Sequence, residues 1–290
     1  MKVTTRRLCF DGTYARFKVY TPADSVTSRA AFCCSPFGDC ESWDALCRLL
    51  AARGCLCVTF ELPGFGHTPV NAPQSNQIRA QILWGVLDEV EIDRGEDPSR
   101  WHLVGHGSGC GVILEMAKQH AESVISRAFI SPVTEKFQDF FSCLLINNRI
   151  GRWVLTKIYN RYANSPDAFA AQVKKLYACE VSGDTVARLY KEFKRRGRFE
   201  TLLHLFEQGY HVSKKAWAIT VPLFMLGGRQ DYFGASFSKK LMKKLTDVEI
   251  HYEDTGHMPM ETMPQELSQY LSGWFASSEG RQKTPVKKKK

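Results

Sequence analysis

The sequence predicts an α/β protein with a mainly parallel central sheet, helices on both faces and an inserted helical cap. Short apolar runs typical of buried strands alternate with segments of helical periodicity, which favours a parallel sheet covered on both sides. Only helical patterns occur at about residues 134–215. The chain has 290 residues and 44% of them are hydrophobic, which suffices for one large core. We therefore expect a single domain over residues 1–280, with the cap at about 134–215 and a basic, disordered tail at 281–290.

Each expected element rests on a local pattern. A hairpin comes first, with strands at 4–10 and 14–20 joined at Asp11-Gly12, a dipeptide that favours tight turns. Further strands are expected at the apolar runs 30–34, 55–62, 101–104, 128–131, 221–226 and 248–252. Helices are expected at 43–52, with Gly54 as its C-cap, and at 77–90, 108–120 and 264–275.

The positive charge of the chain is concentrated in two places. The net charge is +9, but residues 281–290 hold six cations and no acid, and the remainder has 33 basic and 30 acidic residues. Such a tail predicts a solvated end, with weak binding to anionic lipid or nucleic acid as the alternative. The cap segment has 15 Lys or Arg and 8 Asp or Glu. This surplus favours an anionic small-molecule substrate, unless it is only a solvated helix face. We expect no specific nucleic-acid partner, and the sequence leaves the oligomeric state open.

The N-terminal sequence and the cysteines bear on location and cofactors. The chain begins without the apolar run of a signal peptide and has no apolar stretch long enough for a membrane span, so we expect a cytoplasmic protein. Its ten cysteines are then expected to be reduced, with Cys33, Cys34, Cys55 and Cys57 buried in strands. No C-x-x-C pair and no zinc-site spacing occurs, so neither a metal nor another cofactor is predicted.

Four short motifs each follow a predicted strand. The first three are Ser35-Pro36-Phe37-Gly38, Glu61-Leu62-Pro63-Gly64-Phe65-Gly66-His67-Thr68 and Gly105-His106-Gly107-Ser108-Gly109. The fourth is the pair Asp231 and His257, and glycine precedes both residues at the end of a predicted strand. Over about residues 30–275 this order resembles the α/β-hydrolase family, with its oxyanion loop, its D-x-P-G-x-G-x-S loop, its nucleophile elbow and its catalytic acid and histidine. The resemblance implies the α/β-hydrolase fold and hydrolysis of a small ester, thioester or related acyl compound.

The elbow departs from the family pattern. In G-x-S-x-G, small residues two before and two after the nucleophile let the strand and the helix pack closely. Gly105 and Gly109 meet that requirement around Gly107, so the nucleophile position falls on a glycine, which has no side chain to attack a substrate. In the alternative register Ser108 is the nucleophile, and His106 then fills a tight position. We predict Gly107 at the apex and Ser108 at the start of the next helix, its hydroxyl accepting from free backbone N–H groups.

The remaining site residues follow from the same resemblance. Backbone N–H groups of Phe37 and Ser108 are expected as oxyanion-type donors, although an alignment with Pro36 at the first position would remove one donor, since proline has no N–H. His106 precedes the apex and is expected to border the pocket. Glu61 stands where the family usually has aspartate, and we expect it to serve loop structure.

Asp231 and His257 match the acid and the histidine of a catalytic triad. In that arrangement the carboxylate orients the imidazole and the imidazole moves the proton. Three functions remain open: a hydrolase in which Ser108 or another group replaces the missing nucleophile, an enzyme in which His257 is a general base without a covalent intermediate, and a non-catalytic ligand-binding protein. In the last of these the two residues form a structural pair.

Overall fold

The centre of the protein is an eight-stranded sheet in the order β1-β2-β4-β3-β5-β6-β7-β8. The computed structural model describes residues 1–10, 13–35, 38–68, 75–96, 99–132, 148–195, 197–208, 220–233 and 247–283. The strands are β1 (Lys2–Phe10), β2 (Thr13–Thr21), β3 (Ser28–Cys33), β4 (Cys55–Phe60), β5 (Trp101–His106), β6 (Val124–Ile130), β7 (Leu223–Gly228) and β8 (Val248–Glu253). Strands β1, β2 and β4 pair antiparallel, and every pair from β4 to β8 is parallel. The carboxyl ends of the parallel strands therefore meet at one edge of the sheet, where α/β proteins place their sites.

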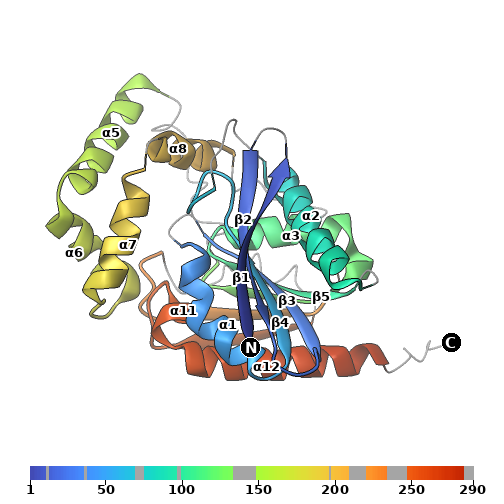
Figure 1. The fold of residues 1–290 in the computed structure, drawn as a ribbon. Helices are drawn as coiled ribbons and strands as arrows, with labels where there is room; N and C mark the ends of the chain where they lie inside the picture. The colour runs from blue at the N-terminus through green and yellow to red at the C-terminus, as the bar shows by residue number, and fades with distance from the viewer. Residues whose placement is uncertain are drawn as a thin grey trace.

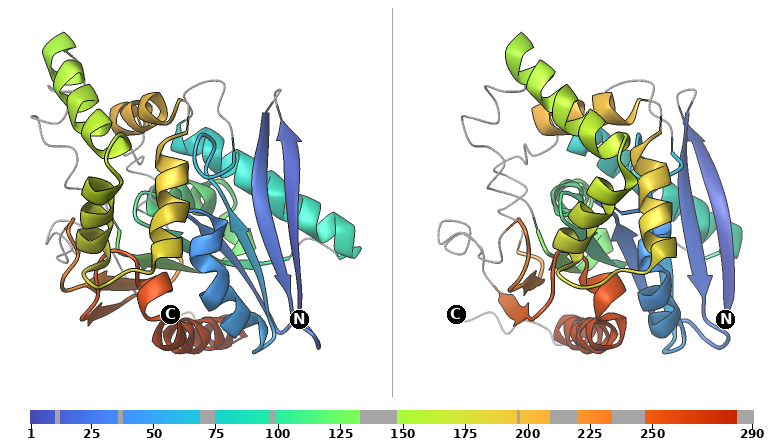
Figure 2. Two further views of the ribbon diagram at one scale, coloured as in Figure 1. Left: turned by 60° about the vertical axis from the view of Figure 1, so that its left-hand side comes forward. Right: turned by 90° about the vertical axis from the view of Figure 1, so that its left-hand side faces the viewer.

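Helices cover both faces of the sheet, as Figures 1 and 2 show. One face packs against α1 (Asp44–Ala51) and α12 (Pro264–Lys283), the other against α2 (Asn76–Arg94) and α3 (Gly109–Gln119). Neighbouring residues of β3 divide between the two cores, Ala30 and Phe32 on one side and Ala31 and Cys33 on the other. Both faces are buried, which explains the uninterrupted apolar runs in the sequence. The predicted fold class is confirmed.

Helix ends differ from the prediction: α2 continues to Arg94, four residues beyond its expected end, and two other helices differ for reasons that the structure shows. The helix expected from residue 43 begins as a 3-10 turn, η1 (Cys40–Trp43), because the Asp39 carboxylate accepts from the Ser42 N–H at 2.9 Å and caps it. Helix α12 continues to Lys283, so the first three residues of the expected tail are helical. Arg281 explains the extension, since its guanidinium pairs with Asp247 at 2.6 Å and lies over the Trp274 ring. Residues 284–290 and the expected Asp11-Gly12 turn lie outside the described residues.

In the described part of the chain between β6 and β7, four helices form a group beside the sheet, seen most clearly in Figure 2. They are α5 (Arg149–Ala163), α6 (Pro166–Tyr177), α7 (Gly183–Phe193) and α8 (Arg198–Gln208). Serine or asparagine side chains cap the first three, at Asn148, Ser165 and Ser182. Both ends of the cap expected at 134–215 lie outside the described residues. We refer to α5–α8 as the cap helices.

The smaller elements and the cysteines complete the described chain. Short helices η2 (Ala121–Ser123) and α11 (Pro259–Thr262) precede β6 and α12. The described cysteines are free thiols, and Cys33, Cys34, Cys55 and Cys57 are buried. Within the described ranges, no helix is both long and apolar enough to cross a membrane.

Candidate active site

The turn from β5 to α3 is centred on Gly107. Its φ is +54°, a left-handed conformation that glycine adopts without strain. A Cβ on Gly105 would lie 2.8 Å from the Cys110 backbone, and a Cβ on Gly109 would lie 2.7 Å from the Cys33 carbonyl oxygen. Both distances are shorter than van der Waals contact, so the close packing of strand, helix and neighbouring loop requires glycine on both sides of Gly107.

Ser108 is the N-cap residue of α3, which begins at Gly109. Its hydroxyl makes no capping hydrogen bond, so the predicted capping role is wrong. The reason is the backbone: φ −70° and ψ −20° are helical, whereas a capping side chain needs an extended N-cap residue. The buried Oγ has no hydrogen-bond partner among the described residues. The Ser108 N–H stands at a helix N-terminus, where anions are favoured.

Asp231 and His257 are brought together from the ends of β7 and β8. His257 Nδ1 lies 2.9 Å from Asp231 Oδ2, and their side chains are 1% and 4% exposed. The second carboxylate oxygen of Asp231 accepts from the Phe233 N–H at 2.8 Å. On the other side, the His257 N–H donates to the Leu176 carbonyl of cap helix α6 at 2.8 Å. These bonds fix the imidazole, with Nδ1–H donating to the carboxylate and Nε2 available for chemistry.

His106 packs against His257, with their ring centres 4.6 Å apart. Its Nε2 lies 2.7 Å from the His257 carbonyl oxygen, and because a carbonyl only accepts, this nitrogen carries a hydrogen. Burial lowers the pKa of His106 well below its ordinary value, and the nearby His257 ring lowers it further. His106 is therefore neutral. The cavity described below is not lined by His106, nor by Ser108.

The depressed pKa of His106 predicts a pH-dependent stability. The unfolded chain takes up a proton on this residue below about pH 6.5 and the folded chain does not, so the free energy of unfolding falls as the pH drops. Between pH 7.5 and 5.5, urea unfolding of the wild type is expected to lose about 1.4 kcal/mol more than His106→Gln, which cannot titrate. The matched control is His120→Gln at an exposed position, which is expected to follow the wild type. Equal pH dependence in wild type and His106→Gln would contradict the assignment.

Ser35 lies beside the elbow, a contact that the sequence does not predict. A Cβ built on Gly107 would lie 3.0 Å from Ser35 Cβ, 3.6 Å from Ser35 Oγ and 3.3 Å from His257 Nε2. Ser35 is 2% exposed. Its proximity arises because β3 and β5 are parallel neighbours, with Cys33 opposite Gly105. Residues so far apart in the chain give no local sequence signal for this contact. Phe37, the other expected oxyanion donor of this loop, lies outside the described residues.

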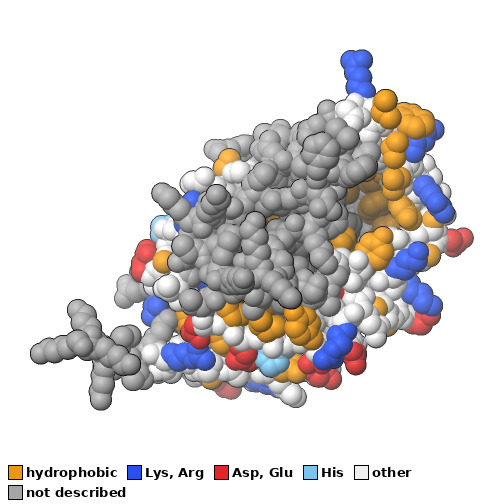
Figure 3. All heavy atoms as spheres, turned by 180° about the vertical axis from the view of Figure 1, so that it is seen from behind, with side chains coloured by type: hydrophobic (Ala, Val, Ile, Leu, Met, Phe, Trp, Pro, Cys, Tyr) orange, Lys and Arg blue, Asp and Glu red, His pale blue; other side chains and the backbone are white. Residues whose placement is uncertain are grey.

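A cavity of about 370 Å³ lies between the cap helices and the loops of the core. Apolar side chains of all four cap helices line it, among them Leu155, Phe169, Leu189 and Leu202. Figure 3 shows hydrophobic side chains gathered at the cap end of one face, with Lys and Arg side chains along its edge. Phe233 also lines the cavity, and its ring centre is 4.7 Å from that of His257. One aromatic ring thus connects the cavity to the imidazole.

Several basic residues of the cap helices are engaged in holding the cap to the core. Arg188 of α7 pairs with Asp39, and with Glu261 at 3.0 Å. Arg198 of α8 donates to the Gly64 carbonyl at 2.7 Å. Part of the positive charge of the cap helices therefore binds the loops that follow β3 and β4 and helix α11, which follows β8.

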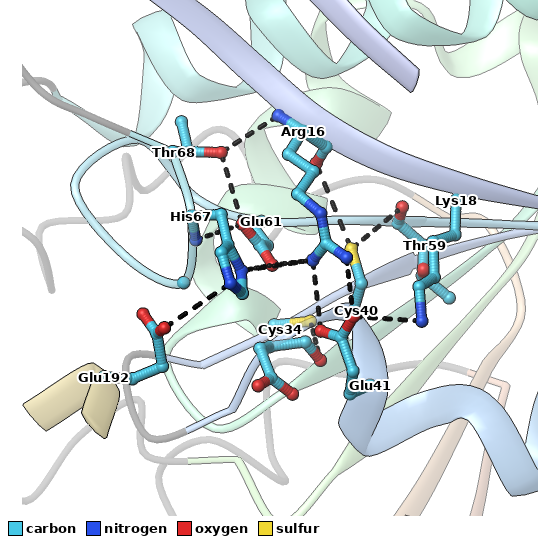
Figure 4. Close-up of polar contacts among 12 residues, drawn as sticks. Arg16, Lys18, Cys34, Cys40, Glu41, Thr59, Glu61, His67, Thr68 and Glu192 are labelled. Atoms are coloured by element: carbon cyan, nitrogen blue, oxygen red, sulfur yellow. Dashed lines mark hydrogen bonds and ion pairs between the residues drawn. The ribbon is translucent and has the colours of Figure 1, made fainter. Parts of the chain in front are cut away.

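Glu61 lies at the centre of an ion-pair network shown in Figure 4. Its side chain is fully buried, receives Arg16 Nη1 at 2.6 Å and accepts the His67 N–H at 2.5 Å. Arg16 also reaches Glu41 at 2.6 Å. Within the described part of the chain, Glu41, Glu61 and His67 are spaced so that they could hold a metal ion. Because the Arg16 guanidinium already bonds both carboxylates, the donor set fits a structural role, and we assign no metal there.

Comparison with known proteins places the chain in a family. The sequence model of the alpha/beta hydrolase family matches residues 34–269. Similar solved structures are Cfl2 from Burkholderia cenocepacia (17% identity, 94% of this chain, 96% of that chain, TM-score 0.76) and the epoxide hydrolase CorEH (13%, 95%, 99%, 0.76). The haloalkane dehalogenase DbeA from Bradyrhizobium elkani is a third (17%, 97%, 100%, 0.74). The search of curated proteins found no match. The solved structures show the fold alone at these identities, but the sequence match covers most of the chain, and the protein belongs to the alpha/beta hydrolase family.

Proposed function

We propose that this protein hydrolyses a small ester, thioester or related acyl compound, with His257 as general base and Asp231 as its orienting carboxylate. The observation that carries the proposal is the buried 2.9 Å contact between His257 Nδ1 and Asp231 Oδ2. It leaves Nε2 facing the turn at Gly107, where an elbow nucleophile would stand. A base held in one tautomer and one orientation accelerates proton transfer by about 10² to 10⁴-fold.

The cavity supports an apolar acyl group as the part of the substrate that the cap recognises. A volume of about 370 Å³ is in the range of small-molecule pockets, and its walls are mainly aliphatic and aromatic side chains. The surplus of positive charge on the cap helices supports a finer proposal. The part of the substrate that stays outside the apolar cavity, at its entrance, carries an anionic group. These two features are compatible in one molecule.

The test is a panel of p-nitrophenyl esters and acyl thioesters of increasing chain length, each in a neutral and an anionic form. Activity that is lost in His257→Gln supports the proposal. No turnover of any member, by wild-type protein that is folded, would contradict it and favour a binding protein. Faster turnover of the anionic forms that weakens as the salt concentration rises supports the finer proposal. Equal turnover of the neutral and anionic forms at low and at high salt rejects it.

Chain length provides a specific prediction about the cavity. Each additional buried CH₂ contributes about 0.8 kcal/mol, so kcat/KM is expected to rise about fourfold per methylene until the cavity is full. Leu155→Trp fills part of the cavity and is expected to lower kcat/KM for the longest productive ester by about tenfold while sparing the acetate. Lys157→Trp, at an exposed position of the same helix, is the control. An unchanged chain-length profile in Leu155→Trp would show that the acyl group binds elsewhere.

The glycine at position 107 favours a second route to the same products. With no side chain at the elbow, His257 could activate a water molecule that attacks the acyl carbon directly. This route forms no covalent intermediate, which distinguishes it experimentally from the one inferred below.

A further inference from the structure

We propose that Ser35, on the loop after β3, is the nucleophile of this enzyme and replaces the serine that the elbow lacks. The inference rests on the proposed function, because it assigns a residue to the same hydrolytic step. In this arrangement the loop after β3 provides the nucleophilic hydroxyl of Ser35. Gly107 at the elbow has no side chain and leaves room for it.

The geometry around Gly107 carries this inference. The point where an elbow side chain would begin is 3.0 Å from Ser35 Cβ, tighter than ordinary van der Waals contact. A side chain on residue 107 would therefore require Ser35 to shift by a few tenths of an ångström. The same point is 3.6 Å from Ser35 Oγ and 3.3 Å from His257 Nε2, so the hydroxyl and the base flank one location.

The Ser35 hydroxyl is not engaged by another described group, and it must move within hydrogen-bond reach of His257 Nε2 before a proton can pass. Its Oγ is buried and has no hydrogen-bond partner among the described residues. Buried hydroxyls without partners are costly, and a catalytic role is one of the explanations for such a group. The backbone of Ser35 is held in place by the Gly38 N–H, which donates to the Ser35 carbonyl at 3.0 Å.

The chemistry balances with water as the only co-reactant. Ser35 Oγ bonds to the acyl carbon while its proton passes to His257 Nε2, and the Asp231 carboxylate stabilises the resulting imidazolium. The acyl C–O or C–S bond breaks, and the leaving alcohol or thiol takes the proton from Nε2. Water then attacks the acyl-Ser35 ester and gives a proton to Nε2. The carbon–Oγ bond breaks and Oγ recovers that proton, which releases the acid. The Ser108 N–H at the start of α3 is placed to stabilise the oxyanion.

The first experiment is labelling with a fluorophosphonate probe, whose phosphorus bonds to a serine oxygen as fluoride leaves. Mass spectrometry is expected to find the adduct on Ser35, in the tryptic peptide of residues 30–48. The adduct is expected to disappear in Ser35→Ala and in His257→Gln. Ser278→Ala removes another buried serine whose hydroxyl has no described partner and is expected to label like the wild type. An adduct on Ser108, which lies in the peptide of residues 101–118, would overturn the inference.

The second experiment separates this inference from the proposed function. In a folded Ser35→Ala variant, ester turnover is expected to fall by about 10³-fold or more, as it does when other serine nucleophiles are removed. Turnover lost in His257→Gln but kept in Ser35→Ala would reject Ser35 and leave the proposed function standing with direct attack by water. No turnover and no labelling in the wild type would reject both.

A swap variant provides an independent readout. Gly107→Ser alone is expected to label no better than the wild type, because the new Cβ would lie 3.0 Å from Ser35 Cβ. Combining it with Ser35→Gly removes that contact, and the label is expected to move to position 107, in the peptide of residues 101–118. A swap variant that is folded and carries no label at position 107 would show that the two positions do not share one site.

Discussion

Replacement of Asp231 by asparagine is expected to lower kcat/KM for the best ester by about 10³ to 10⁴-fold. The amide oxygen of asparagine can keep the bond from the Phe233 N–H, which Asp231 Oδ1 accepts at 2.8 Å. The amide NH₂ then faces His257 Nδ1, which must become an acceptor. The ring hydrogen moves to Nε2, and the nitrogen that should take the proton from the nucleophile is blocked.

The matched control for this change is Asp254→Asn. Asp254 is close in sequence to His257, but its side chain is 75% exposed and pairs with Arg229 at the surface. It is expected to retain wild-type activity. Equal thermal unfolding temperatures for Asp231→Asn and the wild type would assign the loss to chemistry rather than to folding. Full activity in a folded Asp231→Asn variant would show that the Asp231–His257 pair is structural only.

Replacement of Arg16 by methionine is expected to destabilise the fold by about 3–5 kcal/mol, the cost of leaving a buried charge without its partner. Glu61 is fully buried, and without the guanidinium it would keep the His67 N–H but lose the cation that it pairs with. The loop that follows β4 is held by this carboxylate, so the loss is expected to reach the Arg198 contact with Gly64 as well.

Arg6→Met is the control for the Arg16 prediction, and urea unfolding is the measurement. Arg6 pairs with Glu89 at 3.1 Å, but the two side chains are 33% and 37% exposed. Solvent screens such pairs, so this change is expected to cost less than about 1 kcal/mol. Similar small effects of both variants would contradict the assignment of the Arg16–Glu61 pair as a main support of this loop.

Much of the fold follows from local patterns in the sequence. The apolar runs of β3, β4 and β5 predict buried strands because a parallel sheet with helices on both faces requires them. Helix ends are less well predicted, because they depend on contacts from distant residues. The Arg281 contacts with Asp247 and Trp274, which extend α12 to Lys283, are an example.

The sequence by itself determined the family, the order of the motifs that follow the strands, and the glycine at the elbow position 107. Each of these depends only on neighbouring residues or on their spacing along the chain. Only the tertiary structure decided which side chain lies against that glycine. Ser35 reaches Gly107 because β3 and β5 are hydrogen-bonded neighbours in the sheet, although 71 positions separate the two residues in the chain. The same holds for the apolar cavity and for Arg188, whose partners are Asp39 on the loop after β3 and Glu261 in helix α11 after β8. Such contacts arise from the packing of strand ends, which no local pattern records.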